Sequence, residues 1–159
     1  MLQSNRKFMN ALPLLVAAAF FSAGNVTAAD APLSATAVSD KFPAAYASLP
    51  KKKGGACGFD QSKIVSDLRL ISGWGIISAK DGAVPEAIVV GIISADGEKF
   101  VTTTKQKRDD VAKYFKNPGL LESGFNALVS KTDGPMRAKV NIYQVYQGSV
   151  YACAQSGAI

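Results

Sequence analysis

"EAIVVGIISADGEKFVTTT", residues 86–104, is the stretch of sequence that decides the fold. Its first part, residues 86–95, is apolar on both alternating faces, which is typical of a central strand covered on both sides. Asp96-Gly97 is a two-residue turn signal, and a second strand-like run follows it. The stretch therefore predicts a β-hairpin whose first strand lies inside a sheet.

More strand-like runs lie on both sides of this hairpin, separated by glycine and proline turn signals. They cover residues 66–79, 125–131, 137–146 and 149–154. About six or seven short strands at regular spacing predict a mainly β protein, an Ig-like antiparallel β-sandwich. No internal repeat is visible in the sequence.

The strand-like run "SDLRLISGWGIISA", residues 66–79, contains the single tryptophan of the chain. Leu68, Leu70 and Trp74 share one alternating face, while Arg69 and Gly73 share the other. We therefore expect Trp74 to face the core of the sandwich.

A short helix is predicted at the start of "RDDVAKYFKNPGLLESGF", residues 108–125. Asp109 and Asp110 fall in its first turn, and Lys113 and Lys116 fall in its last, which complements the helix dipole. A Pro-Gly pair ends the helix. We expect it to cross from one sheet to the other and to plug the open end of the sandwich.

One face of this predicted helix is apolar. Val111, Tyr114 and Phe115 recur at helical spacing. Because a helix of about eight residues is marginal on its own, this face must pack against the rest of the protein.

The N-terminus carries the signals of export. Arg6 and Lys7 precede an apolar run at 11–21, and small residues follow at 26–29. This pattern predicts a secretory signal peptide over residues 1–29. Since the apolar run is too short to span a bilayer, we expect no transmembrane span after cleavage, and a location in the periplasm or outside the cell.

The remaining chain divides into two parts on composition. Residues 30–56 are rich in Ala, Pro and Lys and predict a flexible tether, with room for a few turns of helix between residues 38 and 49. Residues 57–159 hold the predicted β-sandwich domain. The tether ends in Lys51-Lys52-Lys53, which either contacts anionic lipid or polysaccharide or is a solvated end of the linker.

Two cysteines, Cys57 and Cys153, remain after signal cleavage. An even number of cysteines in an exported chain predicts a disulfide. The bridge closes a loop of 96 residues (153 minus 57) and fastens the start of the domain to its end.

Catalytic patterns are largely excluded because the chain contains no histidine. Triads with a Ser-His or Cys-His pair need imidazole, as do many zinc sites. The carboxylates mostly flank turn glycines, where solvated turn residues are the ordinary interpretation. A hydrolase with a carboxylate pair stays a third alternative, but we expect a non-enzymatic protein without cofactor or metal.

Aromatic and charged residues supply the candidate binding sites. Trp74, Tyr143 and Tyr146 belong to predicted strands, where exposed rings can stack on the apolar faces of sugars, although such rings are more often core. Arg108 and Asp109 are a second candidate for ligand binding. We expect no nucleic acid partner, because the basic residues around Arg108 stand beside two aspartates and the mature chain carries only about +4.

Three pieces of the chain resemble a small β module of bacterial envelope proteins that also occurs beside glycan-handling enzymes. They are Gly73-Trp74, Arg108 with Asp110-Val111-Ala112 and Phe115, and Ser123-Gly124-Phe125. The resemblance covers residues 57–154, with Asp109 where the module has proline. It implies an appended, non-catalytic β-sandwich of unsettled function.

The sequence thus favours an exported, non-enzymatic protein that binds envelope polysaccharide or another exported protein. The alternative is a small periplasmic inhibitor or accessory subunit. An exposed aromatic stripe favours glycan binding, whereas a protruding apolar loop at residues 117–121 favours inhibition.

Overall fold

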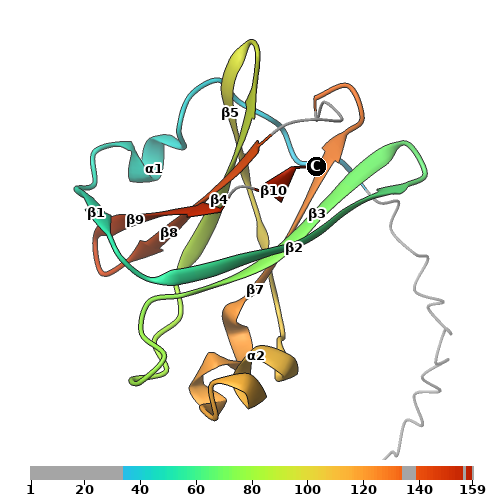
Figure 1. Ribbon diagram of the computed structural model, residues 1–159. Helices are drawn as coiled ribbons and strands as arrows, with labels where there is room; N and C mark the ends of the chain where they lie inside the picture. Colours follow the sequence, from blue (N-terminus) through green and yellow to red (C-terminus); the bar gives the residue numbers. More distant parts are fainter. Residues whose placement is uncertain (1–33, 134–138, 156, 159) are drawn as a thin grey trace, which may run out of the picture. The chain divides into compact units, whose positions relative to one another are not determined.

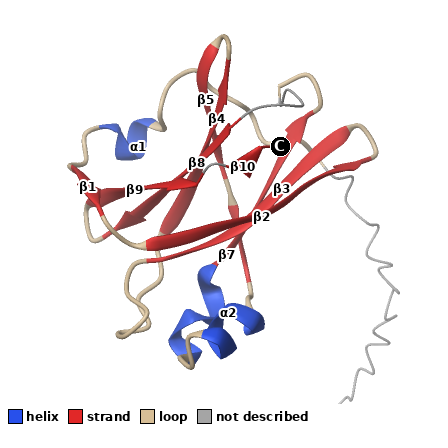
Figure 2. Ribbon diagram, in the orientation of Figure 1, coloured by secondary structure: helices blue, strands red, loops and turns tan. Residues whose placement is uncertain are grey.

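The computed structural model describes residues 34–133, 139–155 and 157–158, and the predicted signal peptide lies outside this part. Two twisted sheets form the described domain (Figures 1 and 2). Sheet A contains β1 (Lys51–Lys53), β4 (Ala87–Ser94), β5 (Gly97–Thr102), β8 (Lys139–Tyr146), β9 (Ser149–Gln155) and β10 (Gly157–Ala158). Sheet B contains β2 (Ala56–Val65), β3 (Leu68–Ile76), β6 (Thr104–Gln106) and β7 (Gly124–Ser130). The helical elements are α1 (Ala44–Ala47), α2 (Asp109–Tyr114) and the 3-10 helix η1 (Pro118–Ser123).

The order of strands confirms a mainly β fold with two sheets. Sheet A runs β1-β9-β8-β4-β5, with β10 also on β8, and sheet B runs β2-β3-β7-β6. Neighbouring strands are antiparallel except β1, which pairs with β9 in parallel. The predicted hairpin is present and β4 lies inside its sheet, between β5 and β8. Its turn comes one residue earlier than predicted, because Ser94 lies opposite Gly97.

The main core fills the space between the two sheets. It is built from alternate residues of five strands and from Cys57, and these side chains are at most 6% exposed. The contributors from the longest runs are Ile88, Val90 and Ile92 of β4, Phe125, Ala127 and Val129 of β7, and Val140 and Ile142 of β8. Both predicted sheets therefore turn an apolar face inward, as a sandwich requires.

The alternation along β3 is the reverse of the one we expected. Arg69, Ile71, Gly73 and Gly75 are buried on one face, whereas on the other face Trp74 is half-buried and packs in a second cluster with buried Ile76. The reason is crowding from β2 and β7, the neighbouring strands of the same sheet. A Cβ at Gly73 lies 2.3 Å from the carbonyl oxygen of Gly58 and 2.7 Å from the Phe125 ring. The inner face of β3 can therefore take glycine there but no larger residue, and the indole occupies the outer face.

We predict that Gly73→Ala destabilises the domain by about 1–3 kcal/mol, since the added methyl group overpacks the core. Chemical denaturation of the variant and of the unchanged protein measures the difference. Ser72→Ala, next to it on the outer face, is the matched control and shifts the free energy of unfolding by less than about 0.5 kcal/mol. Equal stability of Gly73→Ala and the unchanged protein contradicts this account of the register.

The short helix α2 does not cross between the sheets. It joins β6 to β7, which are neighbours in sheet B. The chain passes between the sheets earlier, at Thr103, where β5 ends and β6 begins. Val111 of α2 is 4% exposed and Leu120 of η1 is 0% exposed, and both pack with Ile76 and half-buried Trp74. The helical segment therefore covers one end of sheet B.

The apolar face predicted for α2 is partly wrong. Val111 is buried and Phe115 is half-buried, but Tyr114 is 80% exposed. Its ring contacts Phe115 edge-on, with the ring centroids 4.9 Å apart. Leu120 of η1 completes the apolar contact instead, because η1 folds back against α2 and β3.

Residues 36–50, which we call the strap, run along the domain. We expected this segment to be part of a flexible tether. The Thr36 N–H donates to the Leu128 carbonyl at 2.6 Å, and Ser39 exchanges two backbone hydrogen bonds with Phe100. At the other end the Val150 N–H donates to the Pro50 carbonyl at 3.0 Å. The strap therefore reaches from β5, one edge of sheet A, to β9 near the other.

The strap covers the outer face of sheet A. Val89, Val145 and Val150 lie on the side of their strands that faces away from the main core, yet they are 0%, 2% and 0% exposed. Phe42 of the strap contacts the rings of Phe100 and Tyr143. A second apolar layer on this face explains why β4 is apolar on both alternating sides.

The predicted disulfide is present between Cys57 of β2 and Cys153 of β9. It joins an edge strand of sheet B to sheet A across 96 residues of chain. Cys57 is 4% exposed and belongs to the main core. The bridge therefore ties the two layers together where the first and last long strands meet.

We predict that the double substitution Cys57→Ala and Cys153→Ala lowers the free energy of unfolding by up to about 4–5 kcal/mol, because the unfolded chain regains the freedom of a long loop. Thermal unfolding with and without reductant is the measurement. Reductant should lower the Tm of the unchanged protein and leave that of the double variant unaltered. A double variant as stable as the oxidised protein contradicts the prediction.

Candidate functional site

The five residues predicted for binding lie in separate places. Trp74, Arg108 and Asp109 lie at sheet B and its helical cover, whereas Tyr143 and Tyr146 lie on β8 of sheet A. Tyr146 is half-buried near the end of β8, where its hydroxyl accepts a hydrogen bond from the Gln147 side chain at 3.2 Å. The structure thus brings together two groups rather than one site.

Arg108 is the centre of an ion-pair cluster. Its guanidinium donates to Asp110 at 2.6 and 2.8 Å and also pairs with Asp60. Asp60 lies at a register shift in β2, between Phe59 and Gln61, which is a β-bulge that turns its side chain out of the regular ladder. The cluster therefore joins β2 to the residue that precedes α2.

The guanidinium and the carboxylates of this cluster stabilise one another's charged forms. The hydrogen bonds from Arg108 lower the pKa of Asp110 from 3.8 to about 2, and the two carboxylates raise the pKa of Arg108. The donors of Arg108 are thus directed to protein carboxylates. Asp109 is exposed and lies on the rim of a shallow hollow with Lys113 and Leu121.

Tyr143 belongs to a polar network on the outer face of sheet A. Its hydroxyl donates to Glu98 Oε1 at 2.8 Å, and the Asn141 amide donates to the same oxygen at 2.9 Å. The Glu98 carboxylate lies over Gly91, where a Cβ would come within 2.1 Å of Oε1. Burial and the bond to Glu98 raise the pKa of Tyr143 to about 12.

The Tyr143 ring is also one of three packed rings. Phe42 lies 5.2 Å from Phe100 and 5.3 Å from Tyr143 between ring centroids, both edge-on, and Phe100 lies 5.9 Å from Tyr143. The cluster joins the strap to β5 and β8. It fixes the position of Phe42, which forms part of the wall of a groove.

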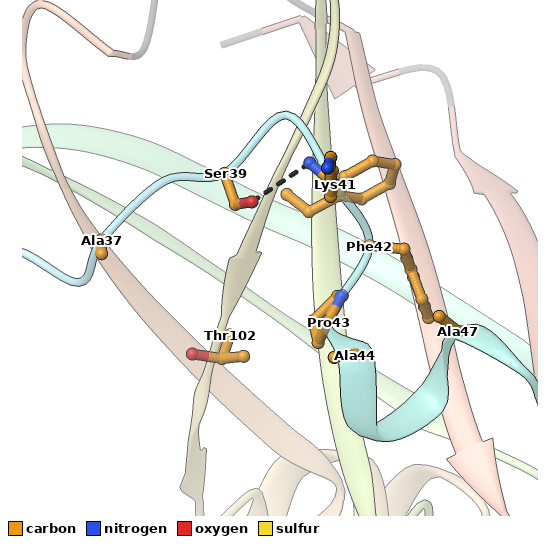
Figure 3. Close-up of a pocket in the computed structure, with 9 residues that line it drawn as sticks. Ala37, Ser39, Lys41, Phe42, Pro43, Ala44, Ala47 and Thr102 are labelled. Atoms are coloured by element: carbon orange, nitrogen blue, oxygen red, sulfur yellow. Dashed lines mark hydrogen bonds between the residues drawn. The ribbon is translucent and has the colours of Figure 1, made fainter.

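This strap groove lies between the strap and β5 and has a volume of about 680 Å³ (Figure 3). Its lining consists of Ala37, Ser39, Lys41, Phe42, Pro43, Ala44 and Ala47 from the strap and of Phe100 and Thr102 from β5. Small and aromatic side chains make up most of its wall, and two hydroxyls and one ammonium group supply hydrogen-bonding groups. The Ser39 hydroxyl accepts a hydrogen bond from the Lys41 N–H at 3.1 Å.

Sequence reasoning missed this groove because it assigned the strap to a tether. A signal was present in the apolar residues Val38, Phe42, Tyr46 and Leu49, which recur three or four positions apart. In the structure these four are half-buried, while most of the residues between them are exposed. Such spacing, in a segment whose other residues are small or polar, indicates an apolar face that packs against the rest of the protein.

In residues 34–133, 139–155 and 157–158, no group of three His, Cys, Asp or Glu side chains is placed to hold a metal ion. The helices in these same ranges are too short or too polar to cross a membrane.

Comparison with protein-family models, with curated proteins and with solved structures finds no match. The resemblance to the envelope β module therefore stays a prediction. The class of protein is defined by the fold alone: a two-sheet β protein with one disulfide and a strap across one sheet.

We predict that Tyr143 ionises at a pH of about 12 in the folded protein, against an ordinary value of 10.0. Because the folded state holds this proton more tightly than the unfolded state, stability that is complete below pH 10 decreases between pH 10 and 12. The ultraviolet absorbance of tyrosinate during an alkaline titration measures the step. Tyr143→Phe should remove the last of the tyrosine steps, and an unchanged titration curve contradicts the assignment.

Proposed function

We propose that this chain is an exported, non-enzymatic binding protein whose ligand is an envelope glycan held in the strap groove. The observation that carries the proposal is the groove itself: about 680 Å³, open along the strap, with ring and alkyl groups beside hydroxyls. A sugar presents apolar C–H patches and hydroxyls together, and sites for such ligands combine apolar walls with a few polar groups.

The packing of the strap on the outer face of sheet A makes the walls of the groove rigid. The Phe42 wall of the groove is held by two ring contacts, and Ser39 is held by two backbone hydrogen bonds to Phe100. A groove whose walls are fixed before binding loses little conformational freedom when the ligand enters. The predicted signal peptide and the disulfide agree with a location in the periplasm or outside the cell.

The alternative, an inhibitor or accessory subunit, draws support from a different place. Within residues 117–121, Leu120 is 0% exposed and Leu121 is half-buried. Tyr114 of α2 is 80% exposed, however, and tyrosine is a residue that often anchors protein contacts. A protein partner would therefore engage α2, on the side of the domain formed by sheet B.

The proposal predicts that a bulky residue in the groove weakens glycan binding without unfolding the protein. Ala47→Arg places a long charged side chain on the groove wall and should weaken binding by about tenfold or more, a loss of about 1.4 kcal/mol. Calorimetric titration of the protein, expressed from the complete sequence, with peptidoglycan fragments and envelope polysaccharides measures the affinity.

Ala45→Arg is the matched control, because Ala45 is exposed on the same short helix but does not line the groove. It should bind as the unchanged protein does. The proposal fails if no glycan binds saturably, or if the two variants lose affinity equally. A protein captured through Tyr114, in the absence of glycan binding, would establish the alternative.

A further inference from the structure

The three consecutive lysines of the chain form an ordered basic edge rather than a loose end. Lys51, Lys52 and Lys53 make up β1, and all three are exposed. β1 is the terminal strand of sheet A, so in the described residues its outer edge has no strand beside it. The Cα atoms of the three lysines are therefore held at a fixed spacing along an open edge.

The register of β1 puts two of the lysines on the face of the strap groove. Lys51 pairs with Val150 and Lys53 pairs with Ala152. In the next pairing Val150 lies opposite Val145, and Ala152 lies opposite Tyr143. Cross-strand partners share a face of the sheet, and Tyr143 contacts Phe42 of the strap on the outer face.

Lys52 faces the other way and is held in place. It pairs with Tyr151, and its ammonium group lies 5.8 Å from the centroid of that ring, within the range of a cation–π contact. Lys51 and Lys53 are thus the two lysines of β1 that point to the side of the groove. Within the described ranges, the ion pairs of the protein involve other residues, Arg108 and Lys131.

We propose that the glycan is acidic, and that Lys51 and Lys53 bind its anionic groups while a neighbouring part of the polymer occupies the strap groove. The proposal rests on the proposed function. Only the short stretch Ser48–Pro50 separates α1, a wall of the groove, from β1. A polymer that occupies both places gains affinity from two linked contacts.

A polymer fits this edge better than a bilayer surface. Recognition of anionic lipid generally uses clusters of about four to eight basic residues beside a membrane-spanning or amphipathic helix. β1 supplies three, of which two share a face, and they lie on a strand. A small number of lysines next to a groove suits a polymer that carries acidic groups at intervals.

The test compares two polymers that differ only in charge, dextran and dextran sulfate, binding to immobilised protein. The double variant Lys51→Gln and Lys53→Gln should bind dextran sulfate about tenfold more weakly. The control is Lys105→Gln with Lys107→Gln, which removes the same charge from exposed positions of sheet B and the loop after it. It should lose less than about threefold, the effect of net charge alone.

Equal losses in the two double variants, or equal binding of dextran and dextran sulfate, overturn the proposal. Binding to vesicles of phosphatidylglycerol and phosphatidylcholine in equal parts, without binding to dextran sulfate, also overturns it and favours a membrane surface. The groove is tested separately by Ala47→Arg. If that variant binds as well as Ala45→Arg does while the lysine variant loses affinity, the groove fails and the basic edge stands.

Discussion

The crowding of Gly73 by β2 and β7, its neighbours in sheet B, is the constraint on which the rest of the structure depends. With a carbonyl oxygen and the Phe125 ring so near, no side chain fits on the inner face of β3 at this point. A strand has only two faces, so the position of glycine decides where every other residue of β3 points. Trp74 is placed on the outer face, and a large indole there needs a cover of its own.

The cover of Trp74 accounts for the helical segment between β6 and β7. Val111, Phe115 and Leu120 pack around Trp74 and Ile76 at one end of sheet B. The Arg108 cluster then fixes the start of α2 to β2 through Asp60. Sheet A has the same requirement on its own outer face, and there the strap supplies the cover. Each sheet thus carries a second, smaller apolar layer outside the main core.

The sequence was a good guide to the strands and a poorer one to their faces. The hairpin, the disulfide and the two-sheet fold follow from turn signals, apolar runs and an even cysteine count. The face of Trp74 did not follow, because Leu68, Leu70 and Trp74 form an apolar set as large as the true inner set, and glycine carries no hydropathy signal. Only the crowding of Gly73 by Gly58 of β2 and Phe125 of β7, a property of the assembled sheet, decides between them.

The strap was missed for a related reason. Proline, alanine and lysine are common in linkers, and composition outweighed the spacing of Val38, Phe42, Tyr46 and Leu49. The strands on which the strap packs also lie about 50 to 100 positions later in the chain. No short stretch of sequence therefore contains both the strap and its partners. The role of α2 was likewise obscured, because the sequence does not show that the crossing occurs at Thr103.

The path of the strap sets the order in which the protein can become functional. The strap precedes every strand of the domain in the chain, but its far end is anchored to β9, the last long strand. A chain that leaves its site of synthesis or a membrane pore from the N-terminus therefore exposes the strap first and can secure it last. The walls of the groove come from the strap and β5, but the anchorage of the strap on β8 and β9 forms only when these C-terminal strands have arrived, so their arrival is the step that fixes the surface for a ligand.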